Sequence, residues 1–208
     1  MASAGTLTTR VLSIGKEGTG VFEIQKDSSP EINISSELRL GPHAVFEAGT
    51  SAHIHMTGSA FINESTAPKY LAGLANLTLI FEGGPGVDDT FEVAGQDLGP
   101  FEAGFASNFA LGTLAIGGAQ EGHVGLVDAV DNQPSWTGAE ALYVDLLEIA
   151  PGSALDLSGL TLYYRMFKGD RDSVNLDGGT IMLASEPTTL SLLAVGGLLA
   201  LRRRRAGR

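Results

Sequence analysis

The stretch that decides the fold is Val11–Gln25, which reads VLSIGKEGTGVFEIQ. Apolar residues alternate with polar ones at Leu12 and Ile14 before a glycine-rich break, and again at Phe22 and Ile24 after it. Alternation with a period of two places apolar side chains on one face of a β-strand. Two such runs around a break rich in glycine, which tolerates backbone conformations that other residues resist, predict a strand–turn–strand unit.

The same pattern recurs along the chain. Residues 114–126 repeat it with the same offsets from the first leucine, at +2, +3, +8, +10 and +12. Residues 38–46 are a shortened relation, and residues 147–157 are another that keeps apolar residues at +8 and +10. The spacing between copies is irregular, so the sequence predicts repeated strand–turn–strand units without a uniform coil length.

The first copy is similar to the repeat shared by autotransporter passengers and PEP-CTERM proteins. That repeat runs Leu-x-Ile-Gly, a small glycine-rich loop, and then Gly-x-Leu-x-Ile. The likeness is clearest over residues 11–25 and next clearest over 113–127. The resemblance implies a β-solenoid, in which each coil buries one row of side chains against the next.

We therefore expect an all-β protein with a β-solenoid-like part over residues 1–82. The strongest chain break, Glu82–Asp89, predicts a boundary. Residues 90–184 are expected to form a second β region, either β-sandwich-like or a cap, separate from the first part or continuous with it. Further strands are predicted at Ala52–Met56, Leu77–Phe81, Thr90–Val93, Leu142–Leu147 and Leu160–Arg165. The segment Ala67–Leu74 predicts one short helical turn.

Residues 185–208 form a third unit, a short hydrophobic helix with a basic end. An apolar run, Leu190–Leu201, ends in Arg202, Arg203, Arg204 and Arg205. A membrane-spanning helix needs roughly 20 apolar residues, so this run spans only marginally. Basic clusters beside a membrane segment stay on the cytoplasmic side, which places the residues before 185 on the far side. The alternative is a buried terminal helix, although four arginines are hard to seat in a soluble core.

The tail resembles the PEP-CTERM sorting unit of Gram-negative envelope proteins. In that family a Pro-Glu-Pro motif precedes a hydrophobic helix and an arginine-rich end. Glu186 and Pro187 match the last two motif positions, while Ser185 replaces the first proline. The resemblance implies an exosortase-type membrane protease as partner, and an inner-membrane anchor before processing.

An exported protein should begin with a charged segment followed by 7–15 apolar residues. The first 18 residues, MASAGTLTTRVLSIGKEG, contain neither. Three explanations are open: a misplaced start codon, a longer gene product of which this is the end, or no export. We favour a missing N-terminal segment.

The charge balance excludes some partners. Residues 1–184 hold 8 of the 13 Lys and Arg and 23 of the 24 Asp and Glu, a balance of −15. A body this acidic repels nucleic acid and anionic lipid, and it attracts divalent cations or basic polymers. Cysteine is absent, so disulfides, thiolate metal sites and cysteine nucleophiles are excluded.

Two stretches are candidate metal sites. His53 and His55 are two residues apart, so a strand would place both on one face, and His43 could join them from one coil earlier. The alternative is a polar row on a solvent-facing sheet. Three carboxylates and one amide that could bind calcium lie within eight residues, at Asp170, Asp172, Asn175 and Asp177. The alternative there is a solvated turn.

Catalytic or sugar-binding groups are less clearly marked. The pairs Asp88-Asp89 and Asp128/Asp131 could serve a glycosidase or lyase as acid and base, but Asp is also common in turns. Trp136 and the pair Tyr163-Tyr164 could stack on sugar rings, or could pack in the core.

The sequence favours an exported, noncatalytic envelope or extracellular-matrix protein that acts as a scaffold or adhesive surface. The family association with exopolysaccharide implies glycan contact. The rival hypothesis is a secreted polysaccharide-active enzyme, a glycosidase or lyase, on a β-helix scaffold. A side groove lined by convergent carboxylates and a basic residue would favour the enzyme.

A reporter fused directly before Ser185 in the complete gene should be found outside the cytoplasm, because the arginine cluster holds only the tail inside. Cell fractionation or a reporter active only after export measures this. A cytosolic reporter would contradict both the localisation and the matrix role.

Overall fold

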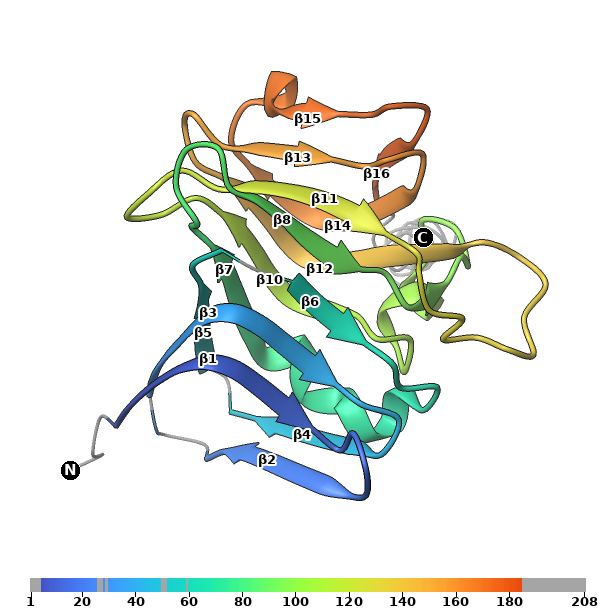
Figure 1. The fold of residues 1–208 in the computed structure, drawn as a ribbon. Coiled ribbons are helices and arrows are strands. Elements are labelled where there is room, and N and C mark those ends of the chain that lie inside the picture. Colours follow the sequence, from blue (N-terminus) through green and yellow to red (C-terminus); the bar gives the residue numbers. More distant parts are fainter. Residues whose placement is uncertain (1–4, 26–27, 29, 50–51, 59, 185–208) are drawn as a thin grey trace, which may run out of the picture.

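The computed structural model describes residues 5–25, 28, 30–49, 52–58 and 60–184. They form a large curled sheet of parallel strands (Figure 1). The expected all-β, solenoid-like architecture is thereby confirmed. The strands form two ladders, each made of parallel strands. Each coil of the chain adds one strand to the first ladder and then one strand to the second.

The two ladders diverge from β3 (Glu31–Leu40). Its first half pairs with β5 and its second half with β6, while β1 (Thr6–Ile14) pairs along both halves. The first ladder then continues through β5 (Ala52–Met56), β7 (Leu77–Phe81), β10 (Leu111–Ile116), β12 (Glu140–Ile149), β14 (Thr161–Lys168) and β16 (Thr180–Leu183). The second ladder continues through β6 (Ala60–Asn63), β8 (Asp88–Glu92), β11 (His123–Val127), β13 (Ala154–Asp156) and β15 (Val174–Asn175).

A third side closes the first coils. It consists of the parallel pair β2 (Gly20–Ile24) and β4 (Ala44–Ala48), followed by the 3-10 helix η1 (Pro68–Asn76), which packs against β4. The helical turn expected at Ala67–Leu74 therefore corresponds to η1. Two shorter 3-10 helices, η2 (Glu102–Phe105) and η3 (Arg171–Ser173), lie in later turns. A short strand, β9 (Gly95–Gln96), pairs antiparallel with the start of β12.

Like side chains stack on one another between the ladders. In the first ladder, register pairs connect a continuous buried column: Ile32, Ile54, Leu79, Leu114 and Leu147. In the second ladder, Leu38, Phe61, Phe91 and Leu126 form another buried column, in which the two phenylalanine rings stack at 4.6 Å. Each such side chain contributes about 1.5–3 kcal/mol when fully buried. The core is therefore a set of rows parallel to the solenoid axis.

The two full copies of the sequence pattern make the same corner. Gly15 and Gly117 have positive φ values of 69° and 82°. A Cβ on Gly20 would collide with the backbone nitrogen of Gly15, and a Cβ on Gly122 would lie 2.7 Å from that of Gly117. The +3 glycine makes the turn, and the +8 glycine lets the chain pass against it.

The shortened copies lie directly on the full ones. Residues 38–46 stack on residues 12–22, with Leu38 on Leu12 and Phe46 on Phe22. Residues 147–155 likewise stack on 114–124, with Leu147 on Leu114 and Leu155 on Val124. In both cases the second copy loses two residues from its turn. Leu155, at +8 in the shortened copy 147–157, therefore pairs with Val124, at +10 in the full copy 114–126.

The break at Glu82–Asp89 comprises the turn at residues 82–87, between β7 and β8, and the first two residues of β8. The same sheet extends on both sides of it, since β7 pairs with β5 and β10, and β8 pairs with β6 and β11. The second half of the described chain thus adds coils to the same parallel stack.

Replacing Gly122 by Ala should destabilise the fold by about 1–3 kcal/mol, because the added Cβ collides with backbone atoms of Phe81 and Gly117. Chemical denaturation measures the change. Gly125→Ala is the matched control: it lies in the adjoining strand β11, and the nearest atoms to its added Cβ are 4.0 Å away. Equal stability of the two variants would contradict the proposed role of the glycine pair.

Candidate binding groove

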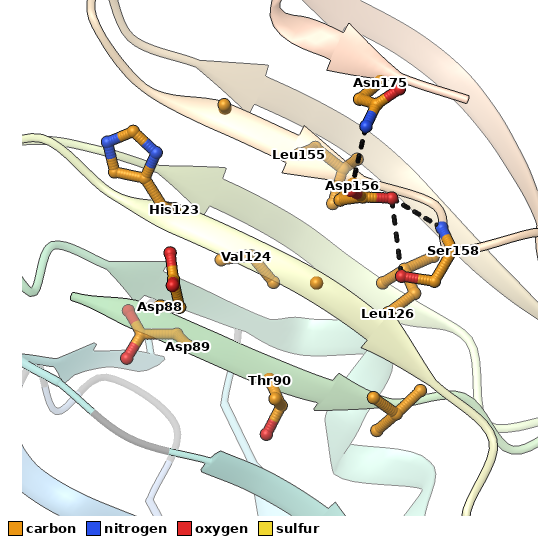
Figure 2. A pocket seen from close by; sticks show the side chains of 13 residues that line it. Asp88, Asp89, Thr90, His123, Val124, Leu126, Leu155, Asp156, Ser158 and Asn175 are labelled. Atoms are coloured by element: carbon orange, nitrogen blue, oxygen red, sulfur yellow. Dashed lines mark hydrogen bonds between the residues drawn. The ribbon is translucent and has the colours of Figure 1, made fainter. Parts of the chain in front are cut away.

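A shallow groove of about 490 Å³ follows the outer surface of the second ladder (Figure 2). Strands β8, β11, β13 and β15 form its floor. Its lining residues are Asp88, Asp89, Thr90, His123, Val124, Gly125, Leu126, Val127, Ala154, Leu155, Asp156, Ser158 and Asn175.

Strand alternation decides which of these side chains face outward. In β11 the side chains of Val124 and Leu126 are buried in the core, so His123 and Gly125 face the groove. Strand register then aligns outward positions from four neighbouring strands into one row, which contains Thr90, Gly125, Asp156 and Asn175. Gly125 has no side chain, and this leaves the row hollow at its middle.

Asp156 organises one end of the groove. Its Oδ1 accepts hydrogen bonds from the backbone N–H of Ser158 at 2.7 Å and from the Ser158 hydroxyl at 3.4 Å. Its Oδ2 accepts from Nδ2 of Asn175 at 2.9 Å. Ser158 has a positive φ of 50°, a conformation that such local hydrogen bonds stabilise. The carboxylate is thus occupied in fixing the turn and the neighbouring strand.

The pair Asp88-Asp89 is split by the strand. Asp88 is exposed on the outer surface, whereas Asp89 is buried, because successive residues of β8 point to opposite faces. The carboxylates facing outward are those of Asp88 and Asp156. Two strand spacings and two residues along the strand separate their Cα atoms, which places them roughly 12 Å apart.

The groove carries carboxylates but no lysine or arginine among its lining residues. Paired glycosidase carboxyl groups lie about 5–5.5 Å apart in retaining enzymes and about 6.5–9.5 Å apart in inverting ones. Even if both side chains leaned toward each other, Cα atoms this far apart would keep the carboxyl groups of Asp88 and Asp156 beyond the retaining range. Hydroxyl, amide and carboxylate groups in a shallow row are suited to hydrogen bonding with a polar ligand.

The other acidic pair lies in the long loop between β11 and β12. Asp128 and Asp131 are exposed there, beside two buried glutamates, Glu92 and Glu140. Burial is the main cause that raises the pKa of each glutamate, with Asp128 contributing, and the pKa of Glu140 reaches about 7. Sequence reasoning missed both glutamates, since each sits singly in a strand and only burial makes it unusual. Glu140 is an acidic residue at a strand position that alternates inward with Leu142, and that pattern could have identified it. Glu92 alternates with the outward Thr90 and gave no such signal.

The histidine pair faces outward together, as predicted. His53 and His55 lie on β5, and Nδ1 of His55 lies 2.7 Å from Oε1 of Glu82. The other Glu82 oxygen accepts a hydrogen bond from the backbone N–H of Ala119 at 2.9 Å. His43 lies in the turn before β4, on the third side. Within the part of the chain that the structure describes, no three His, Cys, Asp or Glu side chains are arranged to hold a metal ion.

The predicted calcium residues lie around η3 and β15. Asp170 caps η3 by accepting a hydrogen bond from the backbone N–H of Asp172 at 3.0 Å. Asn175 binds Asp156, and Asp177 has a positive φ of 41° in the next turn. Two of the four side chains thus stabilise local backbone or a neighbouring strand. Calcium binding there stays a prediction.

The tyrosine pair packs in the interior, since Tyr163 and Tyr164 are only 4% and 2% exposed. Tyr163 stacks on Tyr143 at 4.8 Å, and its hydroxyl donates to Oδ1 of Asp97 at 2.7 Å. A sugar platform would need exposed ring faces, so the packing alternative fits these tyrosines. Trp136, in the loop between β11 and β12, is 38% exposed.

The predicted sorting residues, from Ser185 to Arg205, lie outside the described residues. Among the described residues, no helix has both the length and the apolar character needed to cross a bilayer. No protein-family model matches the chain, and no curated protein or solved structure matches it either.

Asp156→Ala should loosen the groove end and destabilise the protein by about 1–3 kcal/mol, because partners in the turn and in β15 lose their acceptor. Thermal or urea unfolding, together with hydrogen exchange at Ser158, measures this. Asp88→Ala, an exposed acid on the same surface, is the control and should change stability by less than about 0.5 kcal/mol. If both variants behave alike, Asp156 does not organise the groove.

Proposed function

We propose that this protein is an exported, noncatalytic component of the cell envelope or extracellular matrix that binds an extended glycan in the groove on its second ladder. The observation that carries the proposal is the outward row of Thr90, Gly125, Asp156 and Asn175 across four parallel strands. It offers hydroxyl, amide and carboxylate groups along the solenoid axis.

The regular strand spacing suits a polymer. Neighbouring strands lie about 4.7–4.9 Å apart, so equivalent positions recur at that interval along the groove. An extended polysaccharide presents hydroxyl groups at regular intervals as well. A chain running along the axis would therefore meet polar side chains on β8, β13 and β15 and the open position at Gly125 on β11, whereas a compact ligand would contact only one or two strands.

The charge of the groove narrows the ligand class. Asp88 and Asp156 line it without any lysine or arginine. Uronic-acid polymers would be repelled by these carboxylates. Neutral glycans, or glycans that carry free amino groups, are the favoured class.

A noncatalytic role is supported by the same groups. Asp156 already accepts three hydrogen bonds from Ser158 and Asn175, and its separation from Asp88 is larger than that of a retaining carboxylate pair. A retaining glycosidase would need a second acid closer to the first, and a lyase would need the basic residue that is absent from the groove lining.

Delivery to the cell surface rests on the sequence. The PEP-CTERM-like order of Ser185-Glu186-Pro187, the apolar run Leu190–Leu201 and the four following arginines supports export with the basic end in the cytoplasm. In this proposal an exosortase-type protease recognises the motif, and the solenoid body is released or attached at the surface.

Gly125→Gln should block the groove. The added side chain starts from a position with no atom nearer than 4.0 Å, so it extends into the groove without disturbing the core. With a soluble neutral β-glucan and a glucosamine oligomer as probes, we expect at least one to bind, and the variant to weaken that binding at least tenfold by calorimetry. Polygalacturonate should not bind.

Ala115→Gln is the matched control, because Ala115 lies at a half-buried position in the opposite ladder, between register neighbours Ile80 and Glu148. It should bind the probe like the unmodified protein. Binding that Gly125→Gln leaves intact would place the glycan elsewhere. Release of reducing ends from the probe would support the enzyme instead.

A further inference from the structure

The loop at residues 128–139, between β11 and β12, is fastened by two buried glutamates. Glu92 Oε1 accepts hydrogen bonds from the backbone N–H groups of Ala129 and Val130, both at 2.8 Å. Glu140 Oε1 accepts one from the backbone N–H of Asn132, also at 2.8 Å. The glutamates are only 3% and 5% exposed, so both carboxyl groups have been removed from water. Figure 1 shows this long loop projecting from the end of β11.

Asn132 is the innermost residue of the loop. It is 0% exposed, and its Nδ2 donates to the backbone oxygens of Asn63 and Ser65, each at 2.9 Å. Oδ1 of Asn132 and Oε2 of Glu140 are both buried without a hydrogen-bond partner in the described structure. They belong to residues joined by the hydrogen bond from Asn132 N–H to Glu140 Oε1.

Two buried acceptors cannot satisfy each other. Leaving such a group unpaired costs about 1–3 kcal/mol, and more when it is charged. A hydrogen-bond donor or a positive charge must therefore sit beside them: a water molecule, a proton on the carboxyl group, or a cation. The surrounding charge decides among the three.

Carboxylates gather around the buried pair. Asp128 and Asp131 lie exposed on the same loop, close enough for their charges to act on Glu140. Arg39, the cation near Asn63 and Ser65, is already paired with Glu37 and Glu64. No lysine or arginine occurs between Lys69 and Arg165, a stretch that contains thirteen Asp and Glu residues.

We propose that a hard divalent cation, Ca²⁺, binds at this loop through Glu140 Oε2 and Asn132 Oδ1. The carboxylate of Asp128 would bind it from the exposed side. Calcium accepts six to eight oxygen ligands from carboxylates, amides, backbone carbonyls and water. Two side-chain donors, one outer carboxylate, loop carbonyls and water meet that need. This ligand set does not require three converging His, Cys, Asp or Glu side chains, an arrangement that the described residues do not contain.

The cation would fasten the loop to the solenoid. Asn132 connects the site to the backbone at Asn63 and Ser65, two coils earlier in the second ladder, and Glu140 begins β12. Binding would add an ionic contact to these hydrogen bonds, and removal of the cation would loosen the loop that carries Trp136. The site is separate from the calcium residues predicted around η3.

The test is a Ca²⁺ titration of the purified full-length chain after chelation, followed by calorimetry, thermal melting and Trp136 fluorescence. We expect saturable binding, a higher melting temperature and a change in fluorescence. Glu140→Gln should weaken binding at least tenfold without lowering the melting temperature of the calcium-free protein, because an amide removes the buried charge. Asp128→Asn, a surface change that leaves the core intact, should weaken binding about three- to tenfold, as loss of one carboxylate ligand.

Two controls locate the site. Glu148→Gln, which replaces a half-buried acid paired with Lys168 on the same strand as Glu140, should bind Ca²⁺ like the unmodified chain. The double variant Asp170→Asn/Asp172→Asn should do so as well, and a loss there would assign binding to η3 and overturn the proposal. The proposal also fails if Ca²⁺ has no effect, or if the only response is a melting temperature that falls as pH rises, since a proton then fills the place of the cation.

Discussion

The stacking of like side chains along the solenoid axis is the constraint on which the rest of the structure depends. Ile54, Leu79 and Leu114 occupy successive strands of one ladder in strict register, and each is fully buried by its neighbours. A shift of one residue in any strand would turn its apolar side chains outward. Register is therefore fixed by burial, and every outward position is fixed with it.

The groove is a consequence of that register. Since Val124 and Leu155 pair within the core, Gly125 and Asp156 must pair on the surface. The outward row thus inherits the regularity of the core. The register persists when a side chain that faces outward and makes no hydrogen bond to the fold is replaced, so the chemistry of such a surface can differ while the fold stays the same.

The acidic loop shows where the repeated architecture is interrupted. Twelve residues join β11 to β12, whereas four-residue turns join β13 to β14 and β15 to β16, and the backbone N–H groups of the longer loop need acceptors. Glu92 and Glu140 supply them from inside the stack. The consequence is a pair of buried carboxyl groups whose pKa values are raised, in a stretch of sequence that has no lysine or arginine between Lys69 and Arg165.

Much of the fold was readable from the sequence because its determinants are local. Period-two alternation and paired glycines predicted the strands and corners at Val11–Gln25 and at residues 113–127, and β5 and β7 have the predicted bounds. The sequence did not show which copies stack on each other. Their turns differ in length by two residues, and only strand pairing between coils brings them into register. The split of Asp88 from Asp89, the burial of Tyr163 and the meeting of Asn132 with Asn63 were likewise beyond sequence reasoning. Local alternation determines which face a residue takes on its own strand, whereas only the stacked coils decide what lies opposite that face, since those contacts join residues far apart in the chain.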